Sequence, residues 1–180
     1  MSRAALTFEN SIEDANFLLT HFDSVNATAK NPESAEVLKR AGLVMALTAW
    51  ETYVEDRIQE GVTAQLRALN GSMVGNFMTR RLQLELKQLH NPSSDKVKRL
   101  FVEFLEVDVT DSWRWSNYEP ATARKALDEL ISKRGEVVHR SKPKSGGVPA
   151  PHLVRREDLD KAIKFLKCLV AATDKALELQ

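Results

Sequence analysis

The amino-acid sequence predicts an all-α protein, a bundle of five or six helices forming a single domain over residues 1–180. Apolar side chains recur every three or four residues through several long segments, as on one face of a helix. No segment alternates apolar and polar residues in the manner of a half-buried strand. The breaks between segments are short and rich in Asn, Pro, Gly and Ser. A chain of 180 residues can bury a core as one domain.

The first two predicted helices differ in how much of their surface is apolar. A break at Asn31-Pro32 separates them. In the second, residues 34–69, the stretch AGLVMALTAW at 41–50 is apolar all round, which predicts a central helix buried on every side. Asn70-Gly71-Ser72 predicts its end. The first helix has one apolar stripe, made of Phe8, Ile12, Ala15, Leu19 and Phe22.

Two shorter helices and a loop are expected next. Residues 75–90 favour a helix that carries the Arg80-Arg81 pair. Residues 91–95 predict a loop that ends in the N-cap of the next helix. The following helix presents Leu100, Phe101, Phe104 and Leu105 on one face.

Residues 107–119 lack helical periodicity and predict a packed loop. Trp113 and Trp115 lie in this loop. They either stack on RNA bases or anchor the loop against the core. Anchoring is favoured, because each indole has a large area to bury.

The last two predicted helices flank a basic loop. Pro120 suits the first turn of a helix that continues to about Arg140. Residues 142–155 are expected to be the most mobile part of the chain. Glu157 and Asp158 favour the start of the last helix, because acids suit its positive end. Its core stripe is Leu159, Ile163, Leu166, Val170, Thr173 and Leu177.

Composition limits the compartment and the chemistry. Hydrophobic content of 43% and charged content of 28% are ordinary for a soluble protein, and no apolar run approaches the ~20 residues that span a bilayer. The N-terminus lacks the apolar core of a signal peptide, and Cys168 is the single cysteine. We therefore expect a cytoplasmic protein without membrane contact or an intramolecular disulfide.

Charge is unevenly distributed although the net charge is only +1. Residues 133–156 hold seven Lys or Arg against one Glu, whereas residues 8–36 hold six acids against one Lys. Such asymmetry can direct a polyanion to one face, although a solvated basic loop explains it equally well. The candidate nucleic-acid-binding side chains are Lys133, Arg140, Lys142 and Lys144.

One arginine falls on an apolar helix face. At about 100° per residue, Arg134 lies among Leu127, Leu130, Ile131, Val137 and Val138. Burying its charge unpaired costs several kcal/mol, so an internal carboxylate, a second subunit or a bound anion must compensate it. His139 follows five residues later.

Other site chemistries lack their motifs. The sequence contains no HExxH, CxxC or P-loop pattern, so neither a metal nor a cofactor is expected. The histidines are dispersed as His21, His90, His139 and His152.

The segments LTAWETYVEDRI (47–58), DVTDSWRW (108–115) and LDELISKRGEVVH (127–139) occur in this order. With the Arg-x4-His spacing of Arg134 and His139, the chain resembles the RiboL-PSP type of the HEPN superfamily of ribonucleases. The resemblance implies a HEPN-like helical fold and a dimeric, metal-independent endoribonuclease. Gly135 departs from the pattern, since the residue after the arginine is usually polar, often Asn.

Three possibilities remain open. In the first, a toxin or defence effector cleaves RNA: His139 transfers protons, and Arg134 binds the phosphate, with an antitoxin or regulatory protein as a possible partner. In the second, Gly135 leaves a catalytically silent module that binds RNA or protein. A third possibility is a purely structural dimer in which Arg134 pairs with an internal Glu.

Helix geometry predicts a dimer and identifies two acidic residues that could support Arg134. Arg134 and His139 lie about 7.5 Å apart along a helix axis and point in different directions, which favours a homodimer with a shared cleft. Glu51 and Glu55 continue one face of the central helix, where either one pairs with Arg134 or both are solvated.

Overall fold

The computed structural model describes residues 1–28, 32–139 and 154–178. Within these ranges it contains six α-helices and two short 3₁₀ helices, and its sole β-type pairing is an isolated bridge between Trp115 and Tyr118. The predicted all-α class is confirmed. The α-helices are α1 (Arg3–Thr28), α2 (Pro32–Gln65), α3 (Met73–Gln88), α4 (Ser94–Leu105), α5 (Pro120–His139) and α6 (Arg156–Glu178). The 3₁₀ helices are η1 (Leu66–Leu69) and η2 (Val109–Ser112).

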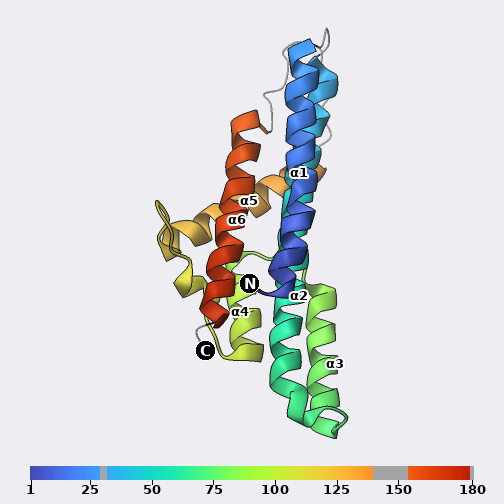
Figure 1. The fold of residues 1–180 in the computed structure, drawn as a ribbon, viewed down its shortest axis with the longest axis vertical. Helices are drawn as coiled ribbons and strands as arrows, with labels where there is room; N and C mark the ends of the chain where they lie inside the picture. The colour runs from blue at the N-terminus through green and yellow to red at the C-terminus, as the bar shows by residue number, and fades with distance from the viewer. Residues whose placement is uncertain (29–31, 140–153, 179–180) are drawn as a thin grey trace.

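Helix α2 is the centre of the architecture and contacts each of the other five α-helices. It runs alongside α1 over one half of the elongated molecule and alongside α3 over the other, while α5 crosses behind α6 and α1 (Figure 1). Its buried side chains include Leu47, Trp50, Tyr53 and Ile58. The prediction that residues 41–50 are buried on every side is wrong at Met45. This side chain is 36% exposed, because no described element covers that side of α2.

The far end of α2 changes helix type earlier than the sequence predicts. The α-helix ends at Gln65, and residues 66–69 continue as the 3₁₀ helix η1. The chain then turns sharply, because α3 begins against η1. A Cβ on Gly75 would lie 2.2 Å from the Leu69 carbonyl oxygen, so this close approach requires glycine.

The two tryptophans of the 107–119 segment anchor it to the core. The Trp113 ring is fully buried, and its indole N–H donates to Thr173 Oγ1 at 2.9 Å. Trp115 stacks with Tyr118, with ring centroids 5.1 Å apart. The anchoring interpretation is therefore confirmed for Trp113, whose ring is inaccessible to an RNA base.

The apolar face of α5 is only partly covered. Leu127 and Val137 are buried, whereas Val138 is 56% exposed, contrary to the predicted stripe. Of the predicted mobile segment, residues 142–153 lie outside the described ranges. None of the described helices is both long and apolar enough to cross a membrane.

A polar network ties the chain's beginning to its last helix. Arg57 on α2 pairs with Asp174 on α6, with Nε and Oδ1 2.8 Å apart, and the Ser2 backbone N–H donates to Asp174 Oδ2 at 2.7 Å. Burial favours the neutral carboxyl, but the Ser2 hydrogen bonds and the Arg57 charge outweigh it and lower the pKa of Asp174. The ionised carboxylate therefore stabilises the fold above its ordinary pKa of 3.8, and this contribution is lost as the pH falls below that value.

We expect Asp174→Asn to lower the free energy of unfolding by about 3 kcal/mol, because Arg57 is left nearly buried without a counter-charge. Urea denaturation at pH 7, followed by circular dichroism, measures the loss. Asp160→Asn is the matched control on the same helix, since its pair with the exposed Lys164 is worth only about 0.3 kcal/mol. Equal losses in the two variants would contradict a special role for Asp174.

Candidate functional site

Arg134 lies where α5 meets α2 and the loop between α3 and α4. Its Nη1 is 3.1 Å from Glu51 Oε2 on α2 and also donates to the Asn91 side-chain oxygen. Both the Arg134 and Glu51 side chains are 19% exposed. Of the three compensating partners considered from the sequence, the structure supplies the internal carboxylate. The Arg134 Nε is buried and has no hydrogen-bond partner among the described residues.

The α3–α4 loop is held firmly against this pair. The fully buried Trp50 donates its indole N–H to the Pro92 carbonyl at 3.0 Å. The adjacent Glu51 accepts the Asn91 backbone N–H at 3.1 Å. Asn91 has a φ of 51°, a left-handed conformation that asparagine tolerates better than most residues. Consecutive residues of α2 thus fix both the path of the loop and its polar contacts.

The same loop connects to α5 through the start of α4. Ser94 donates its backbone N–H to Asp128 Oδ1 at 2.8 Å and its hydroxyl to Asp128 Oδ2 at 2.7 Å. Two helices therefore hold the loop: α2 does so through Trp50 and Glu51, and α5, which also carries Arg134, through Asp128. This arrangement positions any side chain on the loop relative to the guanidinium.

His90 is the loop's exposed titratable side chain. Its Nδ1 is 3.9 Å from Glu51 Oε1, and its side chain is 75% exposed. One carboxylate therefore faces the imidazole with one oxygen and the guanidinium with the other. Neither His90 nor Asn91 is predicted from the sequence to belong here. Their spacing from Arg134 carries no local signal, and only the tertiary fold brings them together.

The two candidate acids separate in the structure. Glu51 pairs with Arg134, whereas Glu55, one turn further along α2, forms no ion pair with it. Burial raises the pKa of Glu55, and the neighbouring carboxylates of Glu51 and Asp56 raise it further, against a smaller opposing effect of His90. Glu55 thus adds an acidic group of raised pKa beside the ion pair.

The other residues predicted from the sequence add little positive charge to the described site. A Cβ added at Gly135 meets no atom within 4 Å, so the position opens to space. The Lys133 amine is 2.7 Å from Asp158, which compensates its charge. His139 closes α5, but its side chain, like Arg140, Lys142 and Lys144, lies outside what the structure describes. Among the described residues, no group of His, Cys, Asp and Glu is arranged to hold a metal ion.

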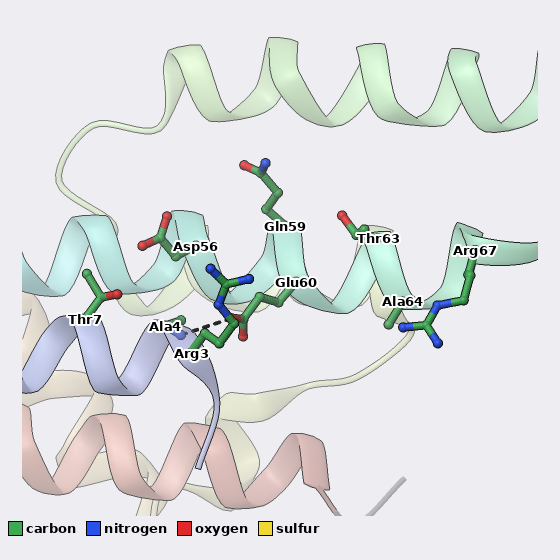
Figure 2. A pocket seen from close by; sticks show the side chains of 9 residues that line it. All are labelled: Arg3, Ala4, Thr7, Asp56, Gln59, Glu60, Thr63, Ala64 and Arg67. Atoms are coloured by element: carbon green, nitrogen blue, oxygen red, sulfur yellow. Dashed lines mark hydrogen bonds between the residues drawn. The ribbon is translucent and has the colours of Figure 1, made fainter. Parts of the chain in front are cut away.

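An open groove of about 580 Å³ lies elsewhere, between the start of α1 and the second half of α2. Figure 2 shows Arg3 beside Glu60, whereas Arg67 lies at the other end of the groove beside Ala64. Glu60 accepts the Ala4 backbone N–H at 3.1 Å, so this acid also supports the start of α1. Arg134 is not among the lining residues, and the motif therefore lies outside this groove.

Comparison with protein families identifies the family of this chain. The family model RiboL-PSP-HEPN matches residues 9–179, almost the whole chain. The chain belongs to the RiboL-PSP-HEPN family. The match confirms the resemblance carried by residues 47–58, 108–115 and 127–139, and with it the HEPN assignment of the helical fold. No curated protein and no solved structure matches this RiboL-PSP-HEPN chain.

Proposed function

We propose that this RiboL-PSP-HEPN protein is a metal-independent endoribonuclease in which Arg134 binds the scissile phosphate and His139 transfers protons. The observation that carries the proposal is the arginine's setting. The Arg134 side chain, which is 19% exposed, stands on an apolar helix face, and Glu51 and Asn91 orient its guanidinium. Arginine's planar fork suits phosphate, and an oriented cation stabilises charge that develops in a transition state.

The guanidinium retains donors for a substrate. Arg134 has five N–H donors, and Nη1 makes its described contacts with Glu51 and Asn91. Because Nε is buried, a phosphate would bind through Nη2 while Glu51 and Asn91 orient the guanidinium. Because Glu51 already compensates part of the charge, a singly charged phosphodiester gains less than the more negative phosphorane. That difference favours the transition state over the ground state.

Cleavage beside a 2′-hydroxyl requires two proton transfers. A base takes the 2′-hydroxyl proton as that oxygen bonds to phosphorus, and an acid protonates the 5′-oxygen as the P–O5′ bond breaks. Imidazole suits both roles near neutral pH. We assign one transfer to His139 and propose His90 for the other, since it lies exposed beside the same Glu51 carboxylate as Arg134.

The amide that usually follows the arginine has a substitute in this chain. Gly135 offers no side chain, but Asn91 brings an amide to Arg134 from the α3–α4 loop. This contact supports a site that remains competent despite the glycine. RNA is the proposed substrate, and the biological role is that of a cytoplasmic toxin or defence effector restrained by an antitoxin or another regulatory protein.

A catalytically silent module that binds RNA or protein is the second candidate. The ion pairs that neutralise basic side chains near the motif favour this second candidate. Glu51 pairs with Arg134, Asp158 with Lys133 and Asp23 with Arg156. Fewer uncompensated charges remain around the motif than the sequence suggests, which weakens the attraction for a polyanion.

We expect purified protein to cleave structured RNA in the presence of a chelator, yielding a 2′,3′-cyclic phosphate or its hydrolysed form and a 5′-hydroxyl. His139→Ala should lower the rate by about 10²- to 10⁴-fold through loss of acid–base catalysis. Arg134→Lys tests phosphate binding, since lysine keeps the charge and loses the fork. Gel assays with end-group analysis measure both. Equal cleavage by wild type and His139→Ala would identify a contaminant and favour the silent module.

We expect His90→Gln to lower the cleavage rate by about 10²-fold or more while RNA affinity changes less than twofold, because glutamine keeps polarity but cannot transfer protons. Single-turnover rates and filter binding separate the two effects. His21→Gln on the exposed side of α1 is the control and should leave both unchanged. If His90→Gln cleaves RNA at the wild-type rate, His90 transfers no proton and His139 is the one catalytic imidazole of each chain.

We expect a homodimer that joins the last turns of α5, where Val138 is 56% exposed beside the motif. Two copies around a twofold axis would line one cleft with two copies each of Arg134 and His139. Sedimentation velocity at micromolar concentration tests the assembly. Val138→Glu should shift the protein toward monomer and lower cleavage, whereas Val102→Glu, an exposed position on α4, should do neither. A monomeric, active wild type would contradict the shared cleft.

A further inference from the structure

Helix α3 is packed on one side only. Over its 16 residues, just Gly75 and Leu82 are buried. Met78 and Leu86 are partly buried against the core on the same side as Leu82. Because most helix stability in proteins comes from packing an apolar face, this helix has little support for its length.

The opposite side of α3 carries apolar side chains into solvent. Met73 is 86% exposed, Phe77 57% and Leu84 54%. At about 100° per residue, these three lie within roughly 40° of one line, diametrically opposite Leu82. Arg80 and Lys87 fall on the same line and are exposed. We call these five residues the α3 stripe; it extends about 21 Å along the helix.

The cations of the α3 stripe have no counter-charge. Neither Arg80 nor Lys87 forms an ion pair with any described residue, whereas the neighbouring Arg81 is paired with Glu85 at 2.6 Å. Surface arginines and lysines on this chain are commonly compensated, as Lys133 and Arg156 are. The stripe therefore combines uncovered apolar area with uncompensated positive charge.

We propose that the α3 stripe is a docking surface for an acidic amphipathic segment of another protein. A helix with apolar residues at intervals of three and four would cover Met73, Phe77 and Leu84, and carboxylates on its flanks would meet Arg80 and Lys87. This proposal is independent of the proposed nuclease activity.

Charge argues against a second copy of α3 as the occupant. Antiparallel pairing of two full stripes sets Arg80 against its own symmetry mate, and like charges in contact are repulsive. The acid that α3 offers, Glu85, already lies 2.6 Å from Arg81 and 3.7 Å from Arg99. A second copy of α3 therefore does not supply the complementary acids.

The test uses a synthetic helical peptide of about 15 residues, with Leu at intervals of three and four and Glu on both flanks. We expect it to bind the full chain with a Kd on the order of 10 μM by fluorescence anisotropy. Phe77→Ser/Leu84→Ser and Arg80→Glu/Lys87→Glu should each weaken binding at least about tenfold. Circular dichroism verifies that both variants remain helical.

Matched controls change the same chemistry elsewhere. Leu6→Ser/Phe17→Ser alters two exposed apolar residues of α1, and Lys125→Glu/Lys164→Glu reverses two exposed lysines. Neither should change the affinity. Equal binding of a scrambled peptide, or of one with Lys in place of Glu, would overturn the proposal. Tighter binding of RNA or of anionic vesicles through the same residues would also overturn it. Self-association of the chain that Phe77→Ser/Leu84→Ser abolishes would do the same.

Discussion

Compensation of the Arg134 charge is the constraint on which the site depends. A permanently charged guanidinium on an apolar helix face needs a counter-charge, because its desolvation otherwise costs several kcal/mol. Glu51 provides that charge from the central helix α2. The pair thus joins α5 to α2, and the same carboxylate accepts the Asn91 backbone N–H. One acidic side chain thereby sets the relative positions of three separate segments.

This compensation also limits the site's chemistry. An arginine that is both structural and phosphate-binding cannot be optimised for both, since a stronger internal pair leaves less charge for a ligand. The orphaned Nε of Arg134 reflects the same conflict, because a buried donor without a partner is unfavourable. Functional sites often retain such unfavourable features when the surrounding fold stabilises them. Here the rigidly held loop and the central helix provide that stabilisation.

Most of the fold is predictable because helices are local. Three- and four-residue spacing identifies the stripe from Phe8 to Phe22 and that of α6, and both are buried as expected except at Leu177, which is partly buried. Helix phase places Glu51 and Glu55 on one face but cannot distinguish them, since their difference arises from where α5 crosses. The roles of His90 and Asn91 depend on a loop packed by Trp50, a contact between residues 42 positions apart. Val138 is misassigned because periodicity identifies a face without identifying what covers it.

The loop beside Arg134 is also the direct continuation of α3. Helix α3 ends at Gln88, and His90 and Asn91 follow within three residues, so no flexible linker separates the α3 stripe from the Glu51–Arg134 pair. A protein that binds the stripe and displaces α3 along its axis would move the loop with it. The Asn91 contacts with Glu51 and Arg134 oppose such movement, and their free energy sets how much binding energy a partner needs to disturb the site. Through this connection, an occupant that shifts α3 would act on Arg134 without touching it.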